Sequence, residues 1–449
     1  MSNSIEKKYA KYDVIVVGGG LAGLSCAFYA SKKGKKVLLL ERKSYLGGRT
    51  SSHIDMGMEV ESGLHRYIGY YSHLPKLLKQ CGVILKDILI WEDEIDILVK
   101  GNDNKVTLGI DPFFAPLRTL RGLIGNTDFI SKEDKFSLVK FFVMGMKDYF
   151  FNSNFDKLSV EEYANIRNVT KNAQNLILEP LSSGLFFLPT SQYSVYNFFK
   201  MFLAAIPKLY KMRVGAFNGG MTDVLCHPIA EAITAMGGEI KVKEDVDFII
   251  HNNERVIGVK TRDNHAFYAP KVVVATPLNV AKRLLKSFSS PELEKLAALP
   301  MMSVCTLQID LNKPCMEKDV TTFGPSTHLV SFAEQSRSTF KNKQGRLSII
   351  IGKNQDLCNY NSEELLKLAK NELLTLGIDI EKDVIRCRKV AEIDEFYSLS
   401  PGCQELRPRQ KSGVKGLILA GDYTLTSSLC TMEGAVISGK KAAKLCTKK

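Results

Sequence analysis

Three glycines and one carboxylate near the N-terminus have the types and spacing of a dinucleotide-binding site. Gly18, Gly20 and Gly23 form the pattern G-x-G-x-x-G, and Glu41 stands 18 residues after Gly23. The first glycine permits a tight turn, the second lets the backbone approach a pyrophosphate, and the third lets a helix pack closely on a strand. A carboxylate at this distance binds ribose hydroxyls and disfavours a 2′-phosphate. The pattern therefore predicts a ligand like NAD or FAD.

The residues around this pattern predict a strand–helix–strand unit that positions it. Residues 12–17 and 36–40 are apolar runs typical of strands buried on both faces, and residues 24–32 have helical spacing. A glycine-rich turn without a ligand is the alternative for any such pattern. Here the strand, glycines, helix, second strand and terminal acid all agree, which favours the dinucleotide site. The predicted contacts include Leu21 and Ala22 between the second and third glycines.

A second cluster of glycine and arginine residues follows the carboxylate. Arg42 comes directly after it, and residues 46–50 read LGGRT. This run resembles the "ER…GGR" segment of the flavoprotein amine oxidase and phytoene desaturase superfamily. The resemblance implies that FAD is the cofactor, that Gly48 lets the backbone approach it, and that Arg49 contacts its pyrophosphate, which suits a guanidinium fork. The alternative for a lone arginine is a solvated loop.

A third block lies near the C-terminus and resembles the ending of the same superfamily. Gly421 and Asp422 follow an apolar run, and Met432 opens the segment MEGAVISGKKAAK, which has helical spacing. The resemblance places Asp422 beside the ribityl-phosphate region of FAD. It also directs the N-terminus of the helix at the flavin, where free amides and the helix dipole can stabilise negative charge.

Two further segments acquire roles only through the resemblance. Gly63, Leu64 and His65 match a "G-x-H" segment that passes beside the isoalloxazine ring in desaturase-like members. His65 is the one catalytic candidate, and it is weak because a lone histidine more often supports structure. Val246 matches a residue that meets the adenine end of FAD through its backbone.

The implied fold is α/β, with a discontinuous Rossmann-like FAD/NAD(P)-binding domain around an inserted α+β substrate domain. We expect the FAD-binding domain at 1–85, 215–285 and 409–449, and the substrate domain at 86–214 and 286–408. Within this frame, residues 54–60 predict a strand. Residues 91–108 predict a hairpin whose turn is at 101–104.

The segments GLHRYIGY, PLSSGLFFLP and CTMEGAVISGK most resemble carotenoid desaturases and squalene-associated dehydrogenases. This implies dehydrogenation of a long isoprenoid lipid by hydride transfer to N5 of noncovalently bound FAD, with a quinone or oxygen as electron acceptor. Amine oxidases have an aromatic residue before the last helix, where this chain has Thr431. Three alternatives remain: an amine or protoporphyrinogen oxidase, a sugar-nucleotide mutase, and a prenyl-binding escort protein without FAD.

Composition limits the other functions. The 449 residues carry a net charge of +13, but the basic residues are not gathered into one run and no nucleic-acid module is visible. The ten cysteines form no C-x-x-C pair and suggest reduced thiols in the cytoplasm, and no metal-ligand spacing appears. No apolar run approaches the length of a membrane-spanning helix.

One acid-free stretch leaves two hypotheses open. Residues 181–222 contain no Asp or Glu and combine aromatic residues with four cations: Lys200, Lys208, Lys211 and Arg213. Such a segment suits a helix on an anionic bilayer surface, to which the protein would bind peripherally. It equally suits a helical substrate domain with its aromatic residues inside. We favour the second hypothesis because burial is the commoner fate of phenylalanine.

Overall fold

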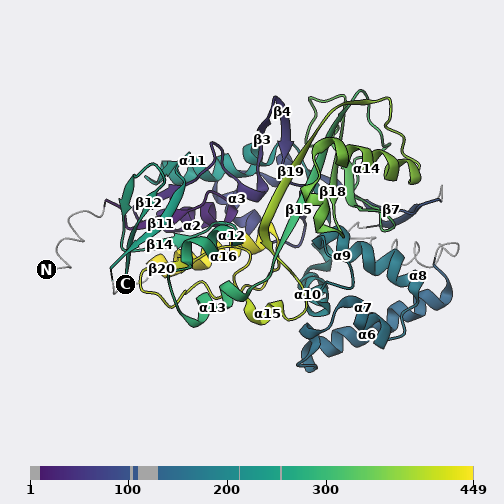
Figure 1. Ribbon diagram of the computed structural model, residues 1–449, viewed down its shortest axis with the longest axis horizontal. Coiled ribbons are helices and arrows are strands. Elements are labelled where there is room, and N and C mark those ends of the chain that lie inside the picture. The colour runs from purple at the N-terminus through teal and green to yellow at the C-terminus, as the bar shows by residue number, and fades with distance from the viewer. Residues whose placement is uncertain (1–10, 102–104, 110–129, 212, 253–254, 448–449) are drawn as a thin grey trace.

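The structure, a computed structural model, describes residues 11–101, 105–109, 130–211, 213–252 and 255–447 (Figure 1). Its central feature is a parallel five-stranded sheet whose strands come from three separate parts of the chain. Their order across the sheet is β10 (Glu239–Lys241), β2 (Val37–Leu40), β1 (Val14–Val17), β14 (Val272–Val274) and β20 (Leu417–Leu419). Every residue of β1 is buried because both faces of the sheet are covered. The predicted discontinuous α/β fold is confirmed.

The first and last helices pack side by side on this sheet. α2 (Leu21–Ser31) follows β1, and α16 (Met432–Thr447) lies against it (Figure 1). A Cβ atom at Gly439 would come within 2.2 Å of the Ala22 carbonyl oxygen, so glycine is required for this close contact. A Cβ atom at Gly23 would come within 1.9 Å of the Gly18 oxygen, which explains the third glycine of the motif.

Glu433 joins the C-terminal helix to a short N-terminal one. Its carboxylate accepts hydrogen bonds from the backbone amides of Ser72, His73 and Leu74 at 2.8–2.9 Å. These amides open α3 (Leu74–Gln80), whose first turn has no side-chain cap of its own. A charge from a distant helix thus satisfies the free amides at the start of α3.

Two smaller antiparallel sheets flank the central one. β11 (Val246–His251), β12 (Val256–Thr261) and β13 (Ala266–Tyr268) form a meander next to α12 (Leu278–Leu285), which also contacts α13 (Pro291–Ala298). β5 (Arg66–Ile68), β9 (Val214–Phe217) and β6 (Leu89–Glu92) form the other. α4 (Leu85–Ile88) precedes β6, and α11 (His227–Ala235) packs on α2 beside the π-helical turn η5 (Thr222–Cys226).

Two predicted strand segments differ from the structure. Residues 54–60 are not one strand but a hairpin of β3 (Ser52–Asp55) and β4 (Met58–Glu61). Met56 and Gly57 both have positive φ, which makes the tight turn. The predicted hairpin at 91–108 is confirmed, but it begins at Glu94, because the chain leaves β6 at Asp93 and changes sheet. Only β7 (Glu94–Leu98) and β8 (Lys105–Gly109) pair; residues 102–104 of the predicted turn lie outside the described residues.

A mixed seven-stranded sheet forms the second large layer. Its order is β19 (Val384–Tyr397), β15 (Met301–Leu311), β18 (Gly345–Ile351), β17 (Leu329–Glu334), β16 (Thr322–Phe323), β7 and β8. The long strands β15 and β19 pair along most of their length and run from this sheet toward the nucleotide-binding sheet (Figure 1). The helix α14 (Ser362–Thr375) covers β19 and β15, and the turn η6 (Gln355–Asn359) precedes it.

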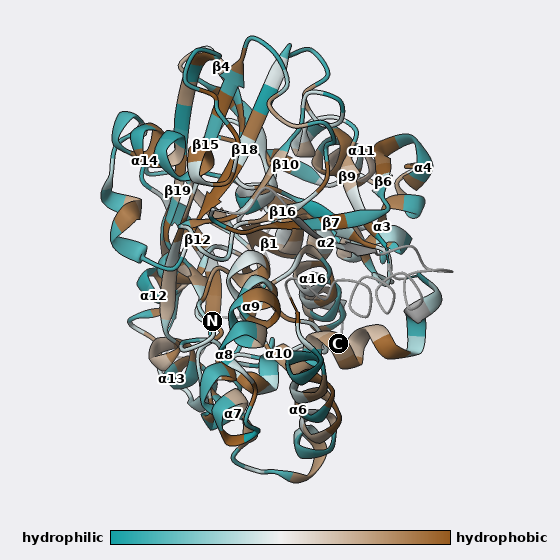
Figure 2. Ribbon diagram, turned by 90° about the vertical axis from the view of Figure 1, so that its right-hand side faces the viewer, coloured by the Kyte–Doolittle hydropathy of each residue, from teal (hydrophilic) through white to brown (hydrophobic). Residues whose placement is uncertain are grey.

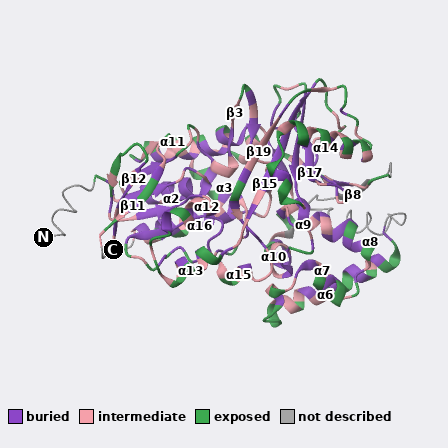
Figure 3. Cartoon of the chain, in the orientation of Figure 1, coloured by how far each residue is buried: buried purple, intermediate pink, exposed green. Residues whose placement is uncertain are grey.

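A helical part lies below the seven-stranded sheet (Figure 1). Its elements are α6 (Lys132–Phe151), η2 (Phe155–Lys157), α7 (Val160–Ile166), α8 (Lys171–Ala173), the π-helical turn η3 (Gln174–Leu178), α9 (Glu179–Phe186), α10 (Val195–Ala205) and η4 (Ile206–Lys211). The core of this part is aromatic, with Phe141, Phe155 and Phe199 buried against one another. Figure 3 shows this buried interior next to an exposed outer face of α6.

The proposed domain boundaries can be compared with the sheets of the structure. The three segments assigned to the FAD-binding domain do supply the five strands of the central sheet. The boundaries at 85 and 214, however, fall within the β5–β9–β6 sheet, which takes strands from both sides. The division at those two positions therefore stays a proposal.

We expect Glu433→Gln to destabilise the protein by about 2 kcal/mol, because three amides of α3 lose a charged acceptor inside the protein. Urea unfolding followed by circular dichroism measures the change. The matched control is Glu231→Gln, since Glu231 is exposed on α11. Equal stability of both variants and the wild type would contradict the capping role.

Candidate functional site

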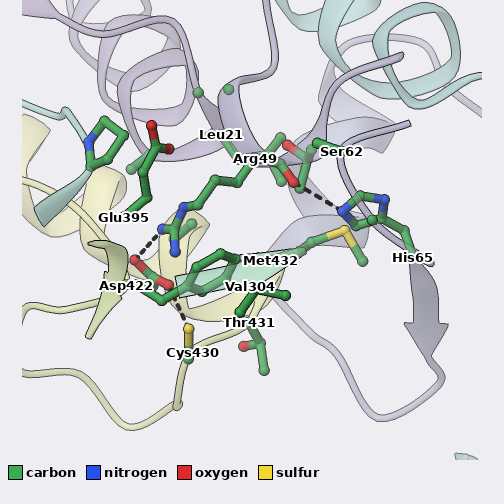
Figure 4. Close-up of a pocket in the computed structure, with 18 of the residues that line it drawn as sticks. Leu21, Arg49, Ser62, His65, Val304, Glu395, Asp422, Cys430, Thr431 and Met432 are labelled. Atoms are coloured by element: carbon green, nitrogen blue, oxygen red, sulfur yellow. Dashed lines mark hydrogen bonds and ion pairs between the residues drawn. The ribbon is translucent and has the colours of Figure 1, made fainter. Parts of the chain in front are cut away.

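One cavity of about 860 Å³ joins the central five-stranded sheet to the seven-stranded sheet and the helical part. At one end it is lined by Glu41 and residues 244–246, at the carboxyl edge of the central sheet. At the other end Leu181, Phe323 and Ile350 line it. It therefore has a polar half and an apolar half, and Figure 4 shows the region between them.

The N-terminus of α2 opens into the polar half. Gly20 is its N-cap and provides no side-chain cap, and the first turn has no acidic residue, so the free amides and the positive end of the dipole face a ligand site. A Cβ atom at Gly20 would touch only the Gly47 carbonyl oxygen, at 3.7 Å. Leu21 and Ala22 line the cavity beside it. The geometry of this glycine cradle suits a pyrophosphate.

Glu41 is fixed at the edge of this cradle. One carboxylate oxygen accepts a hydrogen bond from Gly19 N at 2.6 Å, and the other accepts one from Lys43 N at 2.8 Å. The side chain is buried at the end of β2 and lines the cavity. Arg42 lines it too and forms an ion pair with Glu395 at 3.2 Å. An acid held here can accept further hydrogen bonds from ribose hydroxyls.

Arg49 and Asp422 form an ion pair in the cavity wall. Their Nη2 and Oδ1 atoms are 2.6 Å apart (Figure 4). The Arg49 guanidinium lies 4.4 Å from the ring centroid of Phe396. Burial alone would raise the pKa of the Asp422 carboxyl, but the charge and hydrogen bond of Arg49, the hydrogen bond of Cys430 and the charge of Arg407 together leave the pKa below its usual value. The Cys430 thiol donates to Asp422 at 3.0 Å. Burial and this carboxylate raise the pKa of Cys430 well above its ordinary value, so the thiol stays neutral.

His65 supports the backbone of Arg49. Its Nε2 lies 2.9 Å from the Arg49 carbonyl oxygen, which can only accept, so Nε2 carries the proton and donates (Figure 4). Its Nδ1 lies 3.7 Å from the Glu61 carboxylate. Both ring nitrogens therefore face protein groups. This geometry favours the structural alternative for His65 over the catalytic one, which stays a prediction.

The N-terminus of α16 reaches the middle of the cavity. Thr431 Oγ1 accepts from Gly434 N at 3.1 Å and so caps the helix. Thr431, Met432 and Ala435 line the cavity. The positive end of the helix dipole thus lies beside the position that the resemblance gives to the flavin.

The cavity brings together most of the predicted cofactor residues. Gly23 lies beneath it, against Gly18, while the others line it: Gly18, Gly20, Leu21, Ala22, Glu41, Arg42, Gly48, Arg49, Gly63, Leu64, His65, Val246, Gly421, Asp422 and Met432. Their individual contacts to FAD stay predictions. In the described part of the chain, no group of three or more His, Cys, Asp or Glu side chains could hold a metal ion.

Sequence reasoning missed the cavity residues at the end of β19. Glu395 holds Arg42, and Phe396 lies against Arg49. Burial and the neighbouring Glu395 raise the pKa of Glu392 to about 8. These residues belong to a long strand with no recognisable motif, so only their position in the fold reveals them.

The bilayer-surface hypothesis is wrong for α10. Phe198 and Phe199 are fully buried, and Lys200 is only 9% exposed. Burial and the charge of Arg407 lower the pKa of Lys200 to about 7. Lys208 donates to the Tyr70 carbonyl, and Arg213 lines the cavity. The favoured alternative is confirmed in that Phe198 and Phe199 of this helix lie inside; that this part is the substrate domain stays a prediction.

The apolar half of the cavity contains few charges. Described aliphatic and aromatic residues form most of its wall: Ile177, Leu181, Leu185, Phe202, Phe323 and Ile350. Arg66 also lines it, and its charge is balanced by an ion pair with Glu92 at 2.5 Å. The acidic residues among those that line the cavity, Glu41, Glu244, Asp245, Glu395 and Asp422, belong to its polar half.

Comparisons with known proteins agree with this geometry. The profile of the family "Flavin containing amine oxidoreductase" matches residues 21–447. The chain is 27% identical to a 15-cis-phytoene desaturase from an Oncidium hybrid cultivar, over 96% of this chain and 77% of the relative. It is 25% identical to the 15-cis-phytoene desaturase of Synechococcus elongatus, over 96% of this chain and 95% of the relative.

The fold is also similar to that of solved structures. An oxidoreductase from Methanosarcina mazei aligns with a TM-score of 0.74 at 16% identity, over 96% of this chain and 100% of the other. The open helix terminus, the glycine cradle, the fixed carboxylate and the arginine are what a dinucleotide such as FAD requires. The chain belongs to the family of flavin-containing amine oxidoreductases and is an FAD-dependent oxidoreductase.

Proposed function

We propose that this protein desaturates a long isoprenoid lipid of the carotenoid type. The observation that carries the proposal is the two-part cavity: a polar half that fits FAD opens directly into an apolar half whose described wall has no carboxylate of its own. Relatives that match nearly the whole chain are phytoene desaturases, and phytoene is the substrate that their names give. A hydrocarbon needs an apolar wall and little polar recognition.

In this function the chain's own residues position the substrate and exclude water. When bound, FAD would supply an acceptor for the hydride that leaves a saturated carbon; the neighbouring carbon loses a proton, and the double bond forms between these two carbons. The aliphatic and aromatic wall holds the neighbouring carbons in a dry environment. The N-terminus of α16 offers amides and a positive dipole where negative charge develops. A quinone or oxygen then removes the electrons.

We also propose that FAD is held without a covalent bond. Cys403 does not line the cavity; its sulfur accepts a hydrogen bond from Asn197 Nδ2 at 3.2 Å. Cys430 does line the cavity, but it donates to Asp422 and its thiol is neutral. A neutral buried thiol is a poor nucleophile. Precipitation of the protein with acid tests this proposal, because noncovalent FAD is released into the supernatant. Flavin that remains in the precipitate would contradict it.

The decisive experiment offers candidate substrates to the purified, flavin-loaded protein. Phytoene in liposomes with a quinone as acceptor should yield products with longer conjugation, measured by chromatography and absorbance. Reduction of the flavin by benzylamine or protoporphyrinogen, without a reaction of phytoene, would instead support an oxidase. Binding of a UDP-sugar would support a mutase, and protein that binds no flavin would support an escort role.

A peripheral membrane surface fits the outer face of α6. Phe136, Val139, Val143 and Phe150 are 61–74% exposed, and the exposed Lys132, Lys140 and Lys147 lie among them (Figures 2 and 3). Aromatic residues at the acyl boundary with lysines at anionic headgroups form an interfacial helix. Phe142 of the same helix lines the cavity, so a lipid would have a short path inside. Each described helix is too short or too polar to cross a bilayer.

We expect Arg49→Met to lose FAD and at least about 3 kcal/mol of stability, because Asp422 is left as a buried unpaired charge. The double variant Arg49→Met/Asp422→Asn should recover most of the stability but not the flavin. Thermal unfolding and the flavin absorbance of the purified protein measure the two effects. A double variant that binds FAD as well as the wild type would contradict the role of Arg49.

We expect Leu181→Trp to block the apolar half while leaving the flavin spectrum unchanged, because Leu181 lines that half and a larger side chain there fills space that the substrate would occupy. Phytoene turnover should fall at least about tenfold, the equivalent of 1.4 kcal/mol. The control is Leu374→Trp, since Leu374 is 61% exposed on α14. Unchanged turnover in the Leu181 variant would contradict the substrate position.

Charge reversal of the α6 lysines tests the membrane surface. Lys132, Lys140 and Lys147, all changed to Glu, should release the protein from anionic liposomes in cosedimentation, because headgroup attraction turns into repulsion. The control changes three other exposed lysines to Glu: Lys341, Lys367 and Lys382. Equal loss of binding in both triple variants would show only a general charge effect and would contradict the assignment to α6.

A further inference from the structure

A buried arginine lies directly behind the loop that carries Asp422. Arg407 is 1% exposed, and its Nη2 donates to the carbonyl oxygens of Asp422, Thr424 and Ser428 at 2.6–3.2 Å. Its Nη1 donates to the Gln404 amide oxygen at 3.3 Å. One guanidinium thus connects three points of the segment between β20 and α16.

The charge of Arg407 has no carboxylate partner among these acceptors. Each acceptor is a backbone carbonyl or a neutral amide, and the nearby carboxylate of Asp422 is already paired with Arg49. The surroundings are dry: Tyr397, which stacks near the guanidinium at 5.2 Å, is 1% exposed. Carbonyl dipoles solvate a buried cation only in part, so its field extends into the neighbouring cavity.

Neighbouring groups respond to this charge. Burial is the largest cause that lowers the pKa of Lys200 and of Lys441, and the charge of Arg407 is the second. Arg49, Asp422 and Arg407 together leave one positive charge beside the cavity wall. The segment that Arg407 holds, residues 422–428, leads directly to Cys430, Thr431 and Met432 in that wall.

We propose that Arg407 is a positioning residue for the flavin site that also sets the reduction potential of the cofactor. Its hydrogen bonds hold residues 422–428 so that Asp422 and Thr431 lie in the cavity. Its unpaired charge favours the reduced cofactor, which carries more negative charge than the oxidised one. The inference rests on FAD binding and not on the identity of the lipid.

The alternative is that Arg407 has a purely structural role. Two substitutions separate the effect of its charge from the effect of its hydrogen-bonding geometry. Arg407→Gln keeps N–H donors for the carbonyls but removes the charge. Arg407→Lys keeps the charge but loses the planar fork. The matched control is Lys441→Gln, because Lys441 Nζ donates to Leu425 of the same loop from an exposed position, where solvent screens its charge.

The measurements use the flavin-loaded protein without substrate. The midpoint potential is read against a reference dye, and sulfite affinity is read from bleaching of the flavin band, since sulfite binding places negative charge on the flavin. We expect Arg407→Gln to shift the potential to more negative values and to weaken sulfite binding at least about tenfold. Arg407→Lys and Lys441→Gln should keep the wild-type potential, the former with a lower melting temperature.

Two outcomes overturn the proposal. One is an Arg407→Gln protein that holds flavin with wild-type potential and sulfite affinity, which would leave the charge without effect. The other is an Arg407→Lys protein whose midpoint potential falls although the positive charge is retained. If the Arg407→Gln protein does not bind flavin, the Arg407→Lys protein alone tests the proposal. Neither outcome depends on desaturation of phytoene, so failure here and failure of the proposed function are distinguishable.

Discussion

The ion pair between Arg49 and Asp422 joins the two ends of the fold at the cofactor cavity. These residues are 373 positions apart, yet their side chains meet at 2.6 Å in the cavity wall. Arg49 sits on the glycine cradle of the first segment, and Asp422 follows β20, the last strand of the central sheet. His65 and Phe396 fix one partner, while Arg407 fixes the other. Because unpaired burial of either charge is costly, the two segments must assemble together.

The polar half of the site was predictable because its chemistry is tied to local sequence. A phosphate cradle needs glycines at fixed spacing after a strand, and Glu41 needs only to end the next strand, so a short window contains the whole signal. Arg49, Asp422 and Met432 were found through resemblance, and the cavity brings them together. Glu395, Phe396 and Arg407 escaped prediction because they act from strands and loops whose local sequence has no motif.

The apolar half was less predictable, since burial depends on partners distant in sequence. The acid-free composition around Lys200 was compatible with a bilayer surface and with a buried helix, and the second, favoured hypothesis holds: α10 is enclosed by α6 and α7 and its aromatic residues form a core. The exposed apolar face belongs to α6 instead, a helix that also combines lysines with aromatic residues. Composition cannot separate two such helices, because their packing decides which face meets water. The boundary between β6 and β7 could not be predicted for the same reason. Both segments have sequences typical of strands, and only their tertiary pairing assigns them to different sheets.

The contact between Glu433 and the first turn of α3 has a consequence for how the protein is made. The carboxylate that completes α3 belongs to a residue 359 positions later, and β20 and α16 complete the central sheet from the same late region. During synthesis the N-terminal unit therefore emerges without its last strand, its covering helix and one of its caps. At 5–20 residues per second, it waits roughly 20 seconds or more for them. Such a nascent chain exposes an apolar strand edge for that time, and we expect it to depend on chaperones until translation has passed α16.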